Sequence, residues 1–144
     1  MRFLVLILLA STGCIEGVDP NECHLDADCD GGRRCSAMDR CERPEDLVDV
    51  NVSWTLNGTA PTAATCARLD SLAIGAGDGG SGYLEHVPCE LGTATLLAAP
   101  RAFTIIGASA YRSIGNGNVE ILDQRSMDIA GSPTPDARLD LQIP

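Results

Sequence analysis

Apolar residues alternate with mostly polar ones in two stretches of this chain. In the first stretch, single residues separate Val48, Val50, Val52, Trp54 and Leu56. The second stretch, near the end of the sequence, has the same spacing at Ala137, Leu139, Leu141 and Ile143. Side chains two residues apart lie on one face of a β-strand, so each stretch predicts a strand with one buried face and one solvated face.

Shorter strand candidates lie between these two stretches. They occupy residues 68–74, 82–89, 93–98, 102–112, 118–123 and 125–129. Turn signals separate them, among them the glycine-rich run 75–82 and Gly115-Asn116-Gly117. No segment combines apolar residues at helical spacing with capping residues at its ends. The sequence therefore predicts an all-β fold, an antiparallel β-sandwich of about seven strands.

A change in composition divides the chain near residues 43–47. Residues 15–50 contain eleven acidic residues and four arginines, whereas residues 51–144 contain nine acidic residues and five arginines. A shift of this kind around a proline is typical of a boundary between structural units. We therefore expect a cysteine-rich module at 20–43, a linker at 44–47 and a sandwich domain at 48–144.

The module contains four of the seven cysteines, with five residues between neighbours. These cysteines are Cys23, Cys29, Cys35 and Cys41. So short a segment cannot bury a sufficient core, so we expect disulfides to hold its shape. Four cysteines allow three pairings, and the spacing does not choose among them. The segment resembles short cysteine repeats of exported Gram-negative lipoproteins and, more loosely, the cysteine-rich knot of the Dickkopf family.

Cys66 and Cys89 lie in the predicted sandwich domain. A disulfide between them would close a loop of about 24 residues and stabilise the fold by about 3 kcal/mol in the chain-entropy model. The segments WTLNG, VPCELG and PRAFTIIGASA resemble β-sandwich domains of exported bacterial lipoproteins, which are similar to transthyretin-like and carboxypeptidase-regulatory-like domains. The resemblance implies a fold and no particular activity.

The first fourteen residues have the layout of an export signal. Arg2 precedes the apolar run 3–10, which is too short to span a bilayer, and small residues follow it. With Cys14 the segment LASTGC resembles the lipobox of bacterial lipoproteins, which implies a signal at 1–13, lipidated Cys14 and a tether at 14–19. The alternative is an ordinary cleaved signal with Cys14 as a further disulfide cysteine. The odd count of seven cysteines favours lipidation, because it leaves six that can pair.

Charge and composition exclude some partners. The formal net charge is −10, and the ten cations are all arginines without a basic cluster, so nucleic acid is not expected as a partner. The same acidity disfavours binding to anionic lipid, so contact with the bilayer is expected through the acyl chains of Cys14. We expect the protein in the bacterial cell envelope, in the outer membrane facing the periplasm or the cell surface, where disulfides form.

The module contains potential ligands for two kinds of metal site. Asp26, Asp28 and Asp30, followed by a glycine, match the start of an EF-hand calcium loop, but the twelfth position holds Ala37 in place of a glutamate. These acids are therefore expected to be solvated turn residues that remain a calcium candidate. A zinc site would need closer ligand spacing than five residues, and only His24 is nearby. No cofactor is expected.

The sequence contains no convincing catalytic motif, so we predict no catalytic residue. The leading hypothesis is a non-catalytic, membrane-anchored lipoprotein whose sandwich binds an envelope protein or glycan through its loops, with residues 75–82 and the Asn116 turn as the expected contacts. The alternative is a small calcium-dependent or carbohydrate-active protein using acids such as Glu85, Glu90 or Asp123. That activity would need two carboxylates within reach of each other in a cleft.

Overall fold

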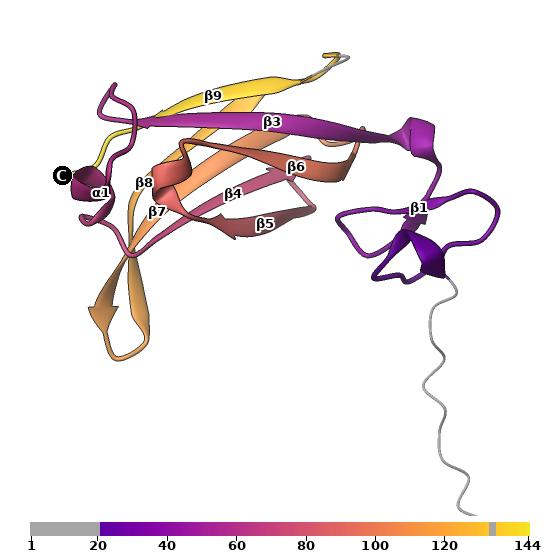
Figure 1. Ribbon diagram of the computed structural model, residues 1–144, viewed down its shortest axis with the longest axis horizontal. Helices are drawn as coiled ribbons and strands as arrows, with labels where there is room; N and C mark the ends of the chain where they lie inside the picture. The colour runs from indigo at the N-terminus through magenta and orange to yellow at the C-terminus, as the bar shows by residue number, and fades with distance from the viewer. Residues whose placement is uncertain (1–20, 133–134) are drawn as a thin grey trace, which may run out of the picture.

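The computed structural model describes residues 21–132 and 135–144, so Cys14 and the predicted signal lie outside the described residues. The chain forms a small cysteine-rich module followed by a sandwich of two β-sheets (Figure 1). The all-β fold class predicted from the sequence is confirmed. No helix in the described residues is long and apolar enough to cross a membrane.

Strand β3 (Leu47–Leu56) is the centre of the first sheet, whose order is β6–β3–β9. The apolar side chains of its alternating pattern, from Val50 to Leu56, are buried. β3 pairs antiparallel with β6 (Thr93–Pro100) and parallel with β9 (Asp136–Leu141). The expectation of a purely antiparallel sandwich is therefore wrong for one pair. Alternation reports which face of a strand is buried, but not the direction of its neighbour.

The second sheet contains four strands in the order β5–β4–β7–β8. These strands are β4 (Ser71–Gly77), β5 (Gly82–Val87), β7 (Ile105–Gly115) and β8 (Asn118–Asp128). All of their pairings are antiparallel. The predicted strands at 118–123 and 125–129 are one continuous strand, because β8 accommodates its irregularity as a register shift opposite Ala110 and Tyr111.

The glycine-rich run 75–82, expected as a turn, is a turn only at residues 78–81, because its other residues belong to strands β4 and β5. Gly75 and Gly77 belong to β4 and approach β5 closely. A Cβ atom at Gly75 would lie 2.3 Å from the carbonyl oxygen of Tyr83, and one at Gly77 would lie 2.6 Å from that of Ser81. These glycines therefore permit close strand pairing rather than loop motion.

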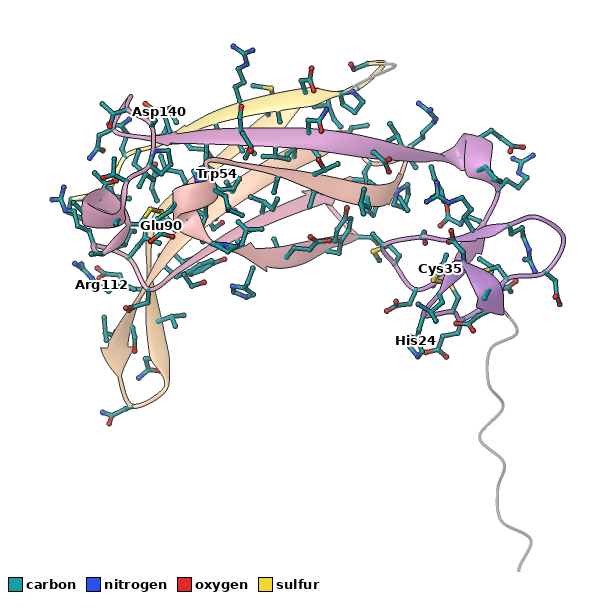
Figure 2. All side chains as sticks on the ribbon, in the orientation of Figure 1. His24, Cys35, Trp54, Glu90, Arg112 and Asp140 are labelled. Atoms are coloured by element: carbon teal, nitrogen blue, oxygen red, sulfur yellow. A yellow bond between two sulfur atoms is a disulfide. The ribbon has the colours of Figure 1, made fainter. Side chains whose placement is uncertain are left out.

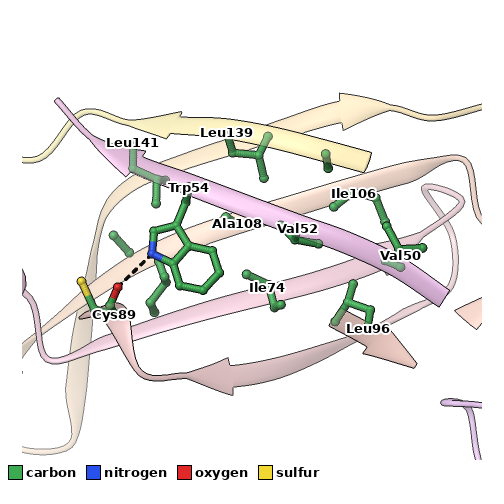
Figure 3. Packing of buried hydrophobic residues seen from close by; sticks show 14 of the residues in the cluster. Val50, Val52, Trp54, Ile74, Cys89, Leu96, Ile106, Ala108, Leu139 and Leu141 are labelled. Carbon is green, nitrogen blue, oxygen red and sulfur yellow. Dashed lines mark hydrogen bonds between the residues drawn. The ribbon is translucent and has the colours of Figure 1, made fainter. Parts of the chain in front are cut away.

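The hydrophobic core fills the space between the two sheets (Figure 3). Trp54 lies in it, as predicted, and its indole N–H donates to the backbone carbonyl of Cys89 at 3.0 Å. This bond satisfies the one polar group of the indole, which would otherwise be costly to bury. The largest fully buried side chains come from both sheets: Leu56, Leu72, Ile74, Leu96, Ile106, Leu141, Val50 and Val52.

A helical turn, α1 (Ala63–Cys66), follows strand β3 along the chain. The Thr62 side chain accepts the Thr65 N–H, and the Thr65 hydroxyl accepts the Thr62 N–H, so the two threonines cap the turn. The predicted strand at 68–74 therefore starts only at Ser71. Cys66 forms the expected disulfide with Cys89, which begins the 3-10 turn η3 (Cys89–Leu91).

In the cysteine-rich module, disulfides join Cys23 to Cys35 and Cys29 to Cys41. This is one of the three pairings that the sequence left open. The bonds hold η1 (Asp26–Asp28) against a two-stranded sheet of β1 (Arg34–Cys35) and β2 (Cys41–Glu42). The short turn η2 (Pro44–Asp46) leads from the module into β3.

The β7–β8 hairpin extends beyond the sandwich at the end away from the module (Figure 1). Its tip is the expected turn, with Asn116 at a φ of 53° between Gly115 and Gly117. The apolar side chains of Ile114, Val119 and Ile121 on this hairpin are largely exposed.

Neighbouring leucines on β6 test the position of the core. Leu96 is 0% exposed and Leu97 is 61% exposed. Leu96→Ala should lower the free energy of unfolding by about 2–5 kcal/mol, because it leaves a cavity. Leu97→Ala is the matched control and should change it by less than about 0.5 kcal/mol. Chemical denaturation of both variants checks this, and equal effects would contradict the described core.

The disulfide between Cys66 and Cys89 gives a second test. Replacing both cysteines by alanine should lower the free energy of unfolding by about 3 kcal/mol, because the open loop gains conformational freedom in the unfolded chain. Denaturation under non-reducing conditions measures the loss, and the two disulfides of the module should remain intact by mass spectrometry. Unchanged stability would mean that this pair does not restrain the fold.

Candidate functional site

A cleft of about 620 Å³ lies where the module meets one edge of the sandwich. We call it the module–sandwich cleft. The module side includes Leu25, Asp26, Ala37 and Asp39, and the sandwich side includes Tyr83, Leu84, Glu85 and Leu97. Figure 2 places the labelled module residues His24 and Cys35 at this end of the molecule, with Arg112 and Asp140 at the other end.

Three largely exposed leucines surround the cleft. Leu25 of the module is 67% exposed, Leu84 of β5 is 64% exposed and Leu97 of β6 is 61% exposed. Single exposed apolar residues are common on protein surfaces, but several around one concave site mark a candidate binding surface. The described residues thus provide apolar contacts from three separate elements at one place.

A β-bulge in β6 sets the position of one wall of the cleft. The pairing of β3 with β6 changes register between Val48 and Val50, and Ala98 has a φ of 51°, unusual for a residue with a Cβ atom. The carboxylate of Asp49 accepts the Ala98 N–H at 2.9 Å. The Ala98 carbonyl in turn accepts the N–H of Ala37 at 3.1 Å, which joins the module to the sandwich.

Further contacts hold the module in place. Met38 packs against the hydrophobic core of the sandwich. At the base of the module, the backbone N–H of Arg101 donates to the carbonyl of Asp46 at 2.8 Å, and its Nε donates to that of Glu45 at 3.0 Å. The cleft is therefore a fixed feature of both parts rather than a gap between independent units.

The charge around the cleft is negative. Asp26 is paired with Arg34, with 3.3 Å between its carboxylate and the arginine Nε. Among the described residues, the one ion-pair contact of Asp39 is with His24, at 3.9 Å, and Glu85 has no ion pair. The carboxylates of Asp39 and Glu85 therefore make the cleft attractive to a cation.

Tyr83 extends from β5 towards Phe103, with 6.2 Å between the two ring centroids. Its hydroxyl is the one buried side-chain polar atom without a hydrogen-bond partner in the described part of the chain. Burial raises the pKa of Tyr83, and the nearby negative charges of Glu85 and Asp49 raise it further. The hydroxyl stays neutral at physiological pH.

The three aspartates of the calcium candidate do not converge in the structure. Asp28 accepts the backbone N–H groups of His24 and Leu25, which hold the pKa of its carboxyl below the usual value. Asp26 accepts the N–H of Cys35 at 2.8 Å. Asp26 and Asp28 thus cap turns of the module, and they do not form a cluster of metal ligands with Asp30.

Three sulfur atoms of the module, those of Cys23, Cys29 and Cys41, lie within 4.8 Å of one another. Such a cluster of thiolates would suit zinc, but each of these sulfurs belongs to a disulfide. Bonded in this way the sulfurs are not thiolates, so the cluster reflects the close packing of two disulfides.

The acids considered for catalysis lie on separate elements. Glu85 is on β5 and Asp123 on β8, which are opposite edges of the four-stranded sheet, while Glu90 lies in η3. Burial opposes the ionisation of Asp123, but hydrogen bonds from the Gln142 N–H and from Arg125 outweigh it and hold its pKa below the usual value. The structure therefore does not bring these three carboxylates together.

The cleft could not be predicted from the sequence. Contacts were expected at residues 75–82 and at the Asn116 turn, whereas Gly82 is on β5 beside the cleft and Asn116 is on the hairpin at the far end. One signal was present: the adjacent residues Leu96 and Leu97 break the period of two and mark the bulge. The contribution of Leu25 depends on the disulfide pairing, which the sequence left open.

The bulge that fixes the cleft wall can be tested at Asp49. Asp49→Ala removes the acceptor of the Ala98 N–H and should lower the free energy of unfolding by about 1–2 kcal/mol. Asp49→Asn keeps an acceptor oxygen and should retain most of the stability. Denaturation of both variants measures the difference, and identical losses would show that the hydrogen bond is not what matters at this position.

No family model matches the chain, and no curated protein or solved structure is significantly similar to it. The function proposed below therefore depends on the residues of this chain alone.

Proposed function

We propose that this protein is a non-catalytic lipoprotein of the bacterial cell envelope, held in the membrane through Cys14, whose sandwich binds a partner. The observation that carries the proposal is the use of the cysteines. Three disulfides take up Cys23, Cys35, Cys29, Cys41, Cys66 and Cys89. Cys14 is the one remaining cysteine of the seven in the sequence. It follows the signal-like segment, and lipidation would give its thiol a chemical role.

The order of the parts supports this proposal. The cysteine-rich module lies between Cys14 and the sandwich along the chain, and two disulfides keep it rigid despite its small size. Such a module acts as a spacer between the bilayer and the binding domain. The protein is placed in the outer membrane, facing the periplasm or the cell surface, because three disulfides need an oxidising compartment.

The absence of a catalytic role is likewise a proposal, and the separation of Glu85, Glu90 and Asp123 supports it. A glycoside hydrolase needs two carboxylates on either side of the scissile bond, one of them with a raised pKa. Asp123 has a lowered pKa and is occupied by Arg125 and Gln142. Exposed apolar side chains at the cleft favour recognition of a partner instead.

The anchor is tested by Cys14→Ser in a Gram-negative host. The unchanged protein should be labelled by radioactive palmitate and fractionate with membranes. The variant should lose the label and move to the soluble fraction, because no acyl chain remains to hold it. A double replacement of Cys66 and Cys89 by serine is the control and should stay with the membrane. A Cys14→Ser protein that remains membrane-bound would overturn the anchor.

A further inference from the structure

The described sandwich has four edge strands, and three of them are interrupted or covered over part of their length. β6 carries the Ala98 bulge and pairs with Ala37 of the module. β8 and β9 lie beside each other, and the N–H of Gln142, just after β9, donates to the carboxylate of Asp123 on β8 at 2.7 Å. Bulges and covering elements are the usual means of preventing an edge from pairing with another chain.

The remaining edge, β5, has only β4 as a strand neighbour. The turn before it is closed by the Asp78 N–H, which donates to the Ser81 carbonyl at 3.0 Å. Asp78 and Ser81 are thus a hydrogen-bonded pair, and such pairs recur at every second residue of an antiparallel ladder. The backbone N–H and C=O groups of Gly82, Leu84 and His86 therefore point away from β4. In the described residues, no backbone hydrogen bond from another element reaches this edge.

This open edge forms part of the module–sandwich cleft, through Tyr83, Leu84 and Glu85. An added strand would therefore gain backbone hydrogen bonds and contacts with exposed Leu84 and Leu97 at the same time. The geometry combines a free hydrogen-bonding edge, apolar side chains and unpaired carboxylates at one place.

The negative charges at the module–sandwich cleft determine which kind of strand can pair with β5. A second copy of this chain would bring two molecules of net charge −10 together, with Glu85 in the centre of the contact. Like charges across paired strands are destabilising, so Glu85 protects the edge against self-pairing. The same carboxylate, with Asp39 near the module, attracts lysine or arginine.

We infer that an extended segment of a protein partner, with alternating basic and apolar residues, binds in the cleft as an additional strand on β5. The inference rests on the proposed binding function and specifies its surface. The partner residue beside Glu85 is basic and the one beside Leu84 is apolar. The backbone bonds supply affinity and these side-chain contacts supply specificity.

The test uses the full chain in detergent micelles and three fluorescein-labelled peptides. KVKVKVKV should show saturable binding by fluorescence anisotropy. EVEVEVEV should bind at least about tenfold more weakly, because its charges repel Glu85 and Asp39. KVKPKVKV should also be at least about tenfold weaker, since proline removes a backbone donor and cannot extend a strand.

Matched variants locate the binding. Glu85→Lys should weaken binding of KVKVKVKV about tenfold or more, whereas Glu90→Lys, with the same charge change on η3, should leave it unchanged. Leu97→Ser should also weaken binding, while Ile114→Ser on the β7–β8 hairpin should not, although the two side chains are 61% and 62% exposed. Circular dichroism confirms that each variant is folded.

A photo-crosslinking residue in KVKVKVKV gives an independent readout, because the products should map to residues 82–87. The inference is overturned by absence of saturable binding, by equal binding of the acidic peptide or by crosslinks to the hairpin. The Cys14→Ser fractionation separates this failure from failure of the proposed function. Loss of peptide binding with an intact anchor removes only the inference, and an unanchored protein that binds the peptide removes only the anchor.

Discussion

The burial of one face of β3 between the two sheets is the interaction on which the rest of the structure depends. Trp54 and its alternating neighbours contact core residues from both sheets. Among the described strands, β3 alone pairs with both β6 and β9, so it holds the first sheet together. Its first half also contains Asp49, which stabilises the bulge that carries the module. A single strand thus links core packing, sheet order and the position of the cleft.

One wall of the cleft is formed at the β-bulge of β6. A regular strand would alternate through residues 93–100, and its edge would be free to pair along its whole length. Leu97 faces outward by ordinary alternation with buried Leu96, and the bulge that follows presents the Ala98 carbonyl to Ala37. The module therefore contacts the β6 edge at Ala98, and among the described residues the edge of β5 has no backbone partner.

Much of the fold could be predicted from sequence because it depends on local pattern. The alternation at residues 48–56 identifies the buried face of β3, and the Gly115-Asn116-Gly117 turn identifies the β7–β8 hairpin. The parallel pairing of β3 with β9 could not be predicted, because strand order depends on how the connections cross between the sheets. The role of the glycines of β4 could not be predicted, since glycine marks a close approach of strands as well as a loop.

The binding site was less predictable than the fold. Leu25 is far from Leu84 and Leu97 in the sequence, and the packing of the disulfide-bonded module against the sandwich brings the three side chains to one cleft. Hydrogen exchange of the β5 amides tests the central claim of an open edge most directly. The amides of Gly82, Leu84 and His86 should exchange at least about tenfold faster than those of Tyr83, Glu85 and Val87, and should become protected when KVKVKVKV is added. Equal protection of all six amides in the free protein would contradict the account.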